Sequence, residues 1–123
     1  MLIMAEWEEL YQYAVGIYRE LHVWPEVGFA LERTVEKVSG ELRKMGISYS
    51  TEYGTCSLVA ELGQGERLVA LRADMDALPV EEKTELPFKS QIPGQMHACG
   101  HDSHTAILLA VARFLKRREE ERL

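Results

Sequence analysis

The run RLVALRA, residues 67–73, constrains the fold of this 123-residue chain more than any other segment, because it is apolar without alternation from Leu68 to Leu71. A strand that is covered on one face alternates apolar and polar residues, whereas a strand covered on both faces is apolar throughout. The segments ISYSTEY and TCSLVAEL precede it, separated by the turn residues Gly54 and GQGE. The sequence therefore predicts three strands, the last of them an inner strand.

Segments with helical spacing of apolar residues lie before and after these three predicted strands. Steps of three and four residues predict a helix over residues 5–22 and a second over residues 31–45, which Gly46 ends. A third helix begins near Asp102 or Ser103, either of which can cap it, and is mostly buried to about Lys116. The charged run KRREEERL is expected to be its exposed helical end. We expect one α/β domain with three layers, in which this last helix packs on the sheet.

Composition excludes several classes of partner. The 14 Lys and Arg residues are scattered among 20 Asp and Glu residues, and the net charge of −6 does not favour nucleic-acid binding. The N-terminus is acidic and no apolar run is long enough to cross a bilayer, so we expect a cytoplasmic protein without a membrane partner. In a reducing compartment Cys56 and Cys99 are not expected to form a disulfide; Cys56 is expected to be a small core residue.

His97, Cys99 and His101 alternate just before the third helix, which would place their side chains on one side of an extended approach. A thiolate and neutral imidazoles suit Zn²⁺ and similar divalent ions, and the following helix N-terminus would favour the thiolate form of Cys99. On spacing alone, the better interpretation is a buried free cysteine with histidines bonded to backbone carbonyls.

A second group of polar residues strengthens the metal hypothesis. Asp74 and Asp76 follow the inner strand and alternate, so both carboxylates can point the same way and would repel each other unless a cation lay close. A solvated loop with turn-forming aspartates is the alternative. His104 could be a ligand, a partner of a ligand or part of the buried first turn, and we favour the last interpretation; His22 is expected to bond the carbonyls at the end of its helix.

Three segments, YRELHVWPEVGFALERT, LRADMDALPVEE and MHACGHDSHTAILLAVARFL, occur in the order and at the intervals of a known family. They resemble the N-terminal portion of the metal-dependent amidohydrolases of the aminoacylase and carboxypeptidase superfamily, nearest to its hippurate hydrolases, N-acetyldiaminopimelate deacetylases and indole-acetic-acid conjugate hydrolases. The resemblance implies that residues 1–123 are the N-terminal part of a catalytic domain with a mixed, mainly parallel sheet flanked by helices. A lid domain and the rest of the catalytic domain would be absent.

The same resemblance assigns roles to individual residues. Cys99 and His101 would be metal ligands, and Asp76 would be the catalytic aspartate that orients a metal-bound histidine. Asp74 and Asp102 would be near neighbours of the site. The cofactors of full-length members would be two divalent ions, drawn from Zn²⁺, Mn²⁺, Co²⁺ and Ni²⁺, and the reaction would be hydrolysis of the amide bond of N-acyl amino acids. With only two of the ligands, residues 1–123 alone are not expected to bind these ions tightly.

Family members are several times longer, and the glutamate pair of their PAEE motif, which supplies the general base and a ligand, is expected after KRREEERL. We therefore expect a truncated product or a shortened fragment that is inactive alone. The alternative function is a non-catalytic remnant that acts as a structural or self-associating domain. In both cases uncovered strand edges and helix faces predict a homo-oligomer.

Overall fold

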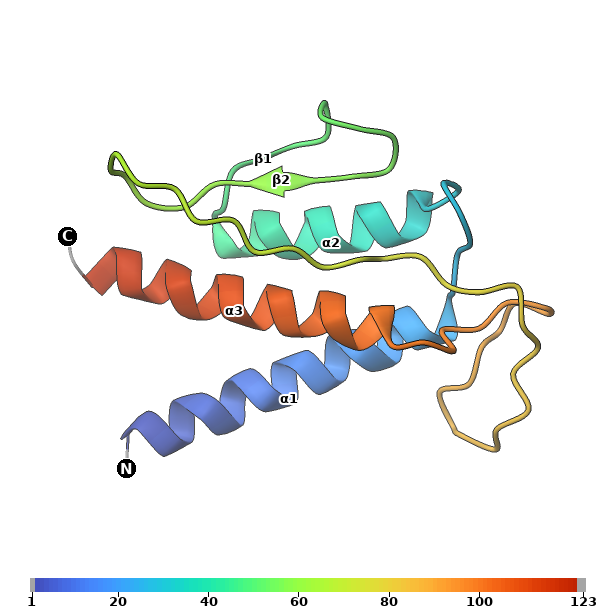
Figure 1. The fold of residues 1–123 in the computed structure, drawn as a ribbon. Helices are drawn as coiled ribbons and strands as arrows, with labels where there is room; N and C mark the ends of the chain where they lie inside the picture. The colour runs from blue at the N-terminus through green and yellow to red at the C-terminus, as the bar shows by residue number, and fades with distance from the viewer. Residues whose placement is uncertain (1, 122–123) are drawn as a thin grey trace.

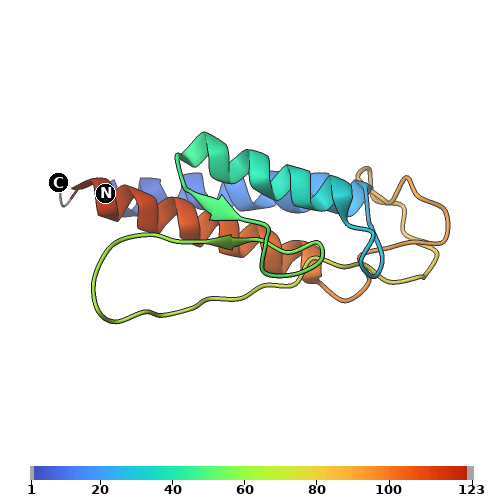
Figure 2. The same ribbon diagram turned by 90° about the horizontal axis from the view of Figure 1, so that it is seen from above.

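The structure is a computed structural model that describes residues 2–121. Three helices and one short hairpin follow each other along the chain: α1 (Leu2–Val23), α2 (Glu32–Met45), β1 (Tyr49–Ser50), β2 (Val59–Ala60) and α3 (His101–Glu121). Helix α3 packs mainly along α1 and also contacts α2, while the hairpin lies beside α2 (Figures 1 and 2). None of the helices within residues 2–121 has the length and apolarity that crossing a bilayer requires.

One apolar core lies between the three helices. It contains buried residues from α1, α2, α3 and the turn after α2, namely Ile17, Leu21, Val38, Leu42, Ile47, Ala106 and Leu109. Burial of each large aliphatic side chain stabilises the fold by about 1.5–3 kcal/mol relative to exposure. The helical spacing predicted for α1 and α2 is confirmed for Leu21, Val38 and Leu42, which lie in this core. It is wrong for Trp7 and Tyr11 in the N-terminal half of α1, which share the same spacing but are 53% and 61% exposed.

Helix α2 has well-defined ends. The carboxylate of Glu26 accepts the backbone N–H groups of Arg33 and Thr34, at 3.1 and 2.6 Å, and so caps the helix from the preceding loop. At the other end Gly46 adopts a left-handed conformation with φ of 73°, and its N–H donates to the carbonyl of Arg43. The stop predicted at Gly46 is therefore confirmed.

The predicted sheet differs most from the structure. Strands β1 and β2 pair antiparallel, with Tyr49 opposite Ala60, and they form a sheet of two strands. The expected inner strand is extended but pairs with no strand among residues 2–121, and Leu68 and Val69 are 87% and 84% exposed. A continuous apolar run indicates that a strand is covered on both faces, but the described residues provide no cover. A three-layer arrangement with a mixed, mainly parallel sheet is thus not seen within residues 2–121.

The segment between β2 and the aspartates runs along α3 instead of entering a sheet (Figure 1). Near its beginning the Gly63 N–H donates to Glu119 at 2.7 Å, and at its end the Asp74 carbonyl accepts the Thr105 hydroxyl at 2.7 Å. Because these two contacts lie at opposite ends of α3, the segment is antiparallel to the helix and delivers Asp74 to the first turns of α3.

Helix α3 is less buried than predicted. It spans His101–Glu121, so the charged run after Lys116 is helical as expected, but the helix packs on helices rather than on a sheet. Ala106 and Leu109 are buried, but Ile107 and Leu115 are 56% and 41% exposed. The prediction of burial on most sides is wrong for these residues, because α1 and α2 cover only one side of α3.

Candidate metal centre

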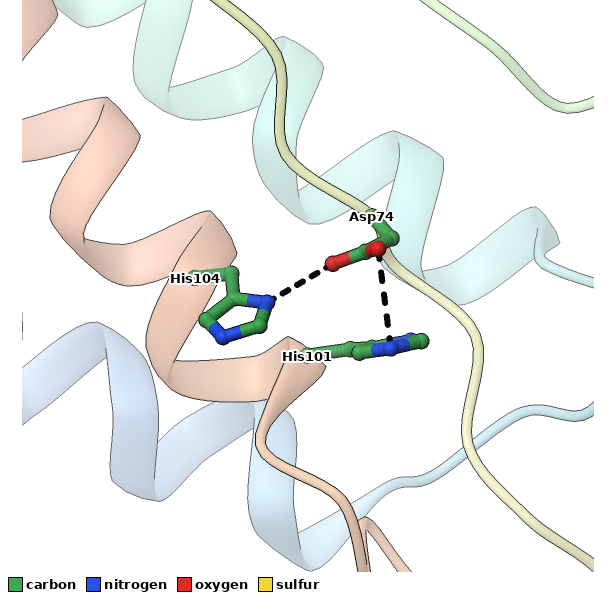
Figure 3. Close-up of side chains that lie close together, drawn as sticks. All are labelled: Asp74, His101 and His104. Carbon is green, nitrogen blue, oxygen red and sulfur yellow. Dashed lines mark hydrogen bonds and ion pairs between the residues drawn. The ribbon is translucent and has the colours of Figure 1, made fainter.

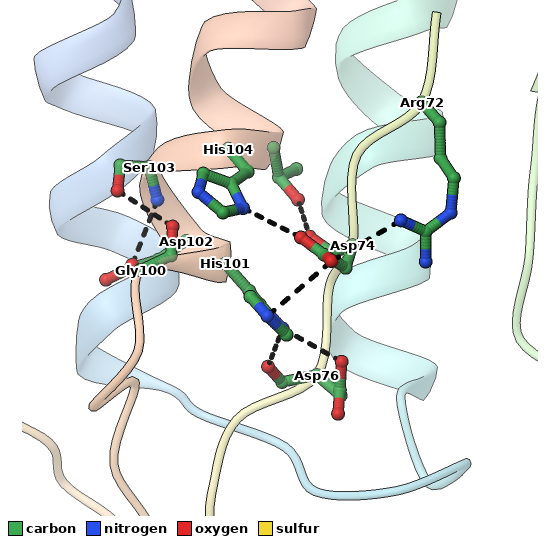
Figure 4. Close-up of polar contacts among 9 residues, drawn as sticks. Arg72, Asp74, Asp76, Gly100, His101, Asp102, Ser103 and His104 are labelled. Carbon is green, nitrogen blue, oxygen red and sulfur yellow. Dashed lines mark hydrogen bonds and ion pairs between the residues drawn. The ribbon is translucent and has the colours of Figure 1, made fainter.

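Two distant segments meet at the N-terminal end of α3. The extended chain at residues 74–76 passes the first turn of the helix, where the Thr105 hydroxyl holds the Asp74 carbonyl (Figure 4). The carboxylates of Asp74 and Asp76 consequently face the imidazoles of His101 and His104. The meeting of these aspartates with His101 was expected from the sequence, whereas the participation of His104 was not favoured.

Asp74 lies between two histidines (Figure 3). Its Oδ1 is 2.8 Å from Nδ1 of His104, and its Oδ2 is 3.5 Å from Nε2 of His101. The hydrogen bond with His104 is the main cause that holds the pKa of Asp74 below its ordinary value. One potential ligand atom from each of the three residues lies within 4.8 Å of the other two, which is close enough for one ion to contact all three.

The orientation of His101 is set by Asp76. Nδ1 of His101 is 2.9 Å from the backbone carbonyl oxygen of Asp76 and 3.0 Å from its carboxylate Oδ1 (Figure 4). Both of these atoms are acceptors, so Nδ1 carries the proton and donates. Nε2 is left facing Asp74, with its lone pair available in the neutral ring. Metal-binding histidines in proteins commonly have this arrangement, in which a carboxylate or carbonyl fixes the ring through its other nitrogen.

These residues fit a divalent ion by their chemistry as well as by their spacing. Imidazole nitrogen and carboxylate oxygen together suit Zn²⁺, Mn²⁺, Co²⁺ and Ni²⁺. Asp74, His101 and His104 are partly or fully accessible, so an ion could reach them from solvent. The geometry therefore supports a candidate metal centre at the start of α3.

Cys99 lies outside this cluster. Its thiol is exposed, and among residues 2–121 it forms no hydrogen bond or ion pair with Asp76 or His101. Gly100, with φ of 132°, separates Cys99 from His101 in a backbone conformation that other residues rarely adopt. Of the three site residues expected from the sequence, the structure brings Asp76 and His101 together, and Cys99 as a ligand stays a prediction.

A second polar cluster lies behind the candidate centre, in the interior. His22 is buried and contacts two buried carboxylates, with Nδ1 2.7 Å from Asp102 and Nε2 3.0 Å from Glu82. The expectation that His22 bonds the carbonyls at its helix end is wrong, because its two nitrogens face these carboxylates. Glu82 and Asp102 lie 60 and 80 residues away along the chain, and no local pattern could have identified them as partners.

His97 completes the interior group. Its ring is buried 6.5 Å from that of His22, and neither of its nitrogens has a hydrogen-bond partner within the described part of the chain. Burial lowers the pKa of His97, so the ring is neutral near pH 7. His97 therefore faces the interior and is not a member of the cluster around Asp74.

Comparison with known proteins relates this geometry to a family. Residues 70–123 match Peptidase family M20/M25/M40. The chain is 46% identical over 121 residues to IAA-amino acid hydrolase ILR1-like 5 of Arabidopsis thaliana, covering 98% of this chain and 28% of that protein. It is 42% identical over 115 residues to Thermostable carboxypeptidase 1 of Saccharolobus solfataricus, covering 91% of this chain and 29% of that protein.

A solved structure agrees with these relatives. The crystal structure of a dinuclear metal binding peptidase of the M20 family from Bacillus subtilis superposes with a TM-score of 0.85 at 36% identity, over 93% of this chain and 33% of that protein. The chain spans less than a third of the length of the curated relatives described above. By sequence and by fold, the chain is similar to the N-terminal portion of members of the M20 peptidase family.

Proposed function

We propose that this chain is part of a metal-dependent amidohydrolase that hydrolyses the amide bond of N-acyl amino acids. The observation that carries the proposal is the orientation of His101, whose Nδ1 is held by Asp76 while its Nε2 faces Asp74. A hydrolase is also indicated by the relatives, which are named as hydrolases and carboxypeptidases.

The metal ligands are part of the proposal. His101 would bind through Nε2, with Asp74 and His104 close enough to contact the same ion, and Asp76 would keep the His101 ring in place. Cys99 would add a thiolate from the segment before α3, where it is exposed to incoming ions. Two divalent ions are supported by the dinuclear metal binding neighbour, and the donor types allow Zn²⁺, Mn²⁺, Co²⁺ or Ni²⁺.

The division of labour in the reaction follows from these groups. A bound divalent ion would polarise the amide carbonyl and lower the pKa of a water molecule. The residues of this chain would hold and orient the ligands, chiefly through the fixed ring of His101. A carboxylate must also accept a proton from water, and we place that role in the glutamate pair of the family, outside residues 1–123.

The substrate class is argued from the relatives and from the chemistry of the site. Proteins named IAA-amino acid hydrolase and carboxypeptidase support a substrate that contains an amino acid on one side of the amide bond. We propose a small N-acyl amino acid in preference to nucleic acid, since the net charge of −6 disfavours polyanions.

The finer features of the fold belong to the same proposal. We place residues 67–73 as an inner strand of a mixed, mainly parallel sheet in the complete catalytic domain. Support comes from the extended backbone of this segment and from the exposure of Leu68, Val69 and Leu71, which are 87%, 84% and 58% exposed. Pairing with further strands would satisfy the backbone groups and cover these side chains.

An activity assay on the product of the complete reading frame tests the function. With N-acyl amino acids and added Mn²⁺ or Zn²⁺, we expect metal-dependent release of the free amino acid. Replacing His101 by Ala should lower the rate by about 100-fold or more, because a ligand is removed. Tyr13→Phe, which removes a hydroxyl between α1 and α2, is the control and should retain activity. Full activity without a metal, or in His101→Ala, would contradict the proposal.

A second candidate function is self-association as a non-catalytic domain. The exposed apolar segment at Leu68 and Val69 favours it, because extended apolar backbone without a partner strand is a template for pairing with another chain. The first function is preferred, because self-association alone gives no reason for the arrangement of Asp74, Asp76 and His101.

A further inference from the structure

The interior cluster around His22 is connected to the candidate metal centre through Asp102. His22 lies in the last turn of α1 and is only 3% exposed. Its Nδ1 is 2.7 Å from Oδ2 of Asp102, and its Nε2 is 3.0 Å from Oε1 of Glu82. Both partners are carboxylates and can only accept when ionised, so both ring nitrogens donate and the ring is an imidazolium.

Asp102 links His22 to the start of α3. Its side chain is 2% exposed, its Oδ2 contacts His22, and its Oδ1 accepts the backbone N–H of Ser103 at 2.9 Å (Figure 4). Both carboxylate oxygens are therefore engaged, one by α1 and one by the first turn of α3. The side chain of Asp102 thus connects the first turn of α3 to the end of α1.

His101 is the residue immediately before Asp102. Successive residues of a helix point about 100° apart, so anchoring Asp102 in the interior directs His101 outward. There the ring meets Asp76, with Nδ1 at 2.9 and 3.0 Å from its two oxygens, and presents Nε2 to Asp74. A rotation of the first turn would move both side chains together.

Glu82 connects the imidazolium of His22 to the chain segment that follows Asp74 and Asp76. Besides His22, it accepts the Ser90 N–H at 2.8 Å and the Thr84 hydroxyl, so it organises the loop over residues 82–90. This loop continues the segment that carries Asp74 and Asp76. His22 consequently joins both segments of the candidate centre to α1 without contacting any of its ligands.

We propose that His22 is a positioning residue, which fixes the first turn of α3 through Asp102 and thereby sets the ring of His101 against Asp76 and Asp74. The proposal rests on the proposed function only in taking His101 as a metal ligand. Its structural content, the dependence of the His101 ring on His22, can be measured without metal or substrate. Failure of one proposal is thus distinguishable from failure of the other.

The test is ¹H–¹⁵N NMR of the histidine side chains in the metal-free 123-residue chain. In the unmodified chain the neutral ring of His101 should show a single tautomer, protonated at Nδ1, since that atom faces two acceptors. In His22→Gln the first turn loses its charged anchor, and we expect the His101 signals to shift to a mixture of the two neutral tautomers. Helical content, followed by circular dichroism, should be retained.

A matched control separates positioning from general destabilisation. Tyr13→Phe removes a partly buried hydrogen bond of 3.0 Å to Glu41, which joins α1 to α2 away from the start of α3. This variant should keep the single tautomer of His101. A folded His22→Gln chain with the unmodified tautomer, or an equal loss in Tyr13→Phe, would overturn the proposal.

If His22→Gln does not fold, Asp102→Asn decides, because it keeps the size of the side chain and removes only the charge that His22 contacts. Loss of the single His101 tautomer in this variant supports the proposal, and an unchanged tautomer overturns it.

Discussion

At the scale of single residues, the candidate centre depends on which atoms of each histidine are already engaged. His101 uses Nδ1 for Asp76 and keeps Nε2 for the site, whereas His104 uses Nδ1 for Asp74. The alternation of aspartates after the apolar run predicted that both carboxylates could point the same way, and the family resemblance implied that Asp76 would lie near His101. In the structure both aspartates contact His101. Alternation could not predict the place of Cys99, because its direction depends on the conformation of Gly100, whose φ is 132°.

The contacts of His22 could not be predicted from local sequence either, since its partners come from two distant segments. The buried ion pair has a consequence for stability as a function of pH. Burial lowers the pKa of His22, but the hydrogen bonds with Asp102 and Glu82 outweigh it and raise the pKa above the ordinary 6.5. Its contribution is therefore complete below about pH 6.5, the value in the unfolded chain, and is lost as pH rises through the folded pKa.

The pKa of Glu82 determines how the stability of the fold changes at acidic pH. Burial raises its pKa, yet the hydrogen bonds from Thr84, Ser90 and His22 outweigh burial and leave the pKa below the ordinary 4.5. Its contribution is present above about pH 4.5 and is lost as pH falls through the folded pKa. The cluster should stabilise the fold most between these two values.

We predict that His22→Gln destabilises the chain by about 3–5 kcal/mol near pH 6, because two buried carboxylates lose their cation. The titratable groups that face His22 are Asp102, Glu82, the neutral His97 and Tyr18, and the Phe88 ring packs beside them. Above pH 6.5 the free energy of unfolding should fall with pH more steeply in the unmodified chain than in the variant. Urea unfolding between pH 5 and 9 measures this difference, and parallel curves for the two proteins would show that His22 is not the titrating group.

At the scale of elements, the helices were predictable because their signals are local. The apolar steps over residues 31–45 and in the second half of residues 5–22 follow the face that packs in the core, whereas Trp7 and Tyr11 are exposed. Gly46 ends α2 where the sequence predicts. The capping of α2 by Glu26 was not predicted, because the carboxylate reaches Thr34 from eight residues upstream. Sequence periodicity identifies the buried face of a helix but not the side chain that closes its end.

The end of α2 gives a direct test of this local account. Gly46 has φ of 73°, so Gly46→Ala should destabilise the chain by about 1 kcal/mol through backbone strain, with no clash, as the added Cβ meets only Lys116 at 3.9 Å. Gly40 lies inside the same helix, where an added Cβ meets only Arg43 at 3.7 Å. Gly40→Ala should therefore stabilise by about 0.5–1 kcal/mol. Thermal unfolding of both variants measures the two shifts, and shifts of the same sign would contradict the assignment of the cap.

At the scale of the whole molecule, the apolar run at residues 67–73 predicts a feature of the sheet that depends on residues elsewhere. The pattern predicts a strand that is covered on both faces, but it does not say which residues provide the cover. Within residues 2–121 the segment pairs with no strand, and Leu68 and Val69 are exposed. The three layers depend on such covering residues, which explains why the helices were predicted better than the sheet.

We predict that the 123-residue chain associates through this segment, because pairing would bury Leu68 and Val69 and satisfy free backbone groups. Sedimentation velocity over a range of concentrations should show dimers or larger species. The double substitution of Leu68 and Val69 by Lys should weaken association, whereas Tyr53→Lys, at another exposed residue, should not. Sedimentation of the unmodified chain as a monomer at all concentrations would be evidence against this role of the segment.

The central proposal is that the start of α3 binds a divalent ion, and Co²⁺ titration followed by absorption spectroscopy tests it most directly. We predict that the chain binds Co²⁺ with a sulfur-to-metal charge-transfer band, that Cys99→Ser loses this band, and that His101→Gln weakens binding by about 10-fold or more. Cys56→Ser is the matched control, since Cys56 lies on another part of the chain beside the Phe29 carbonyl, and it should bind Co²⁺ unchanged. Absence of Co²⁺ binding, or binding that neither Cys99→Ser nor His101→Gln alters, would contradict the assignment.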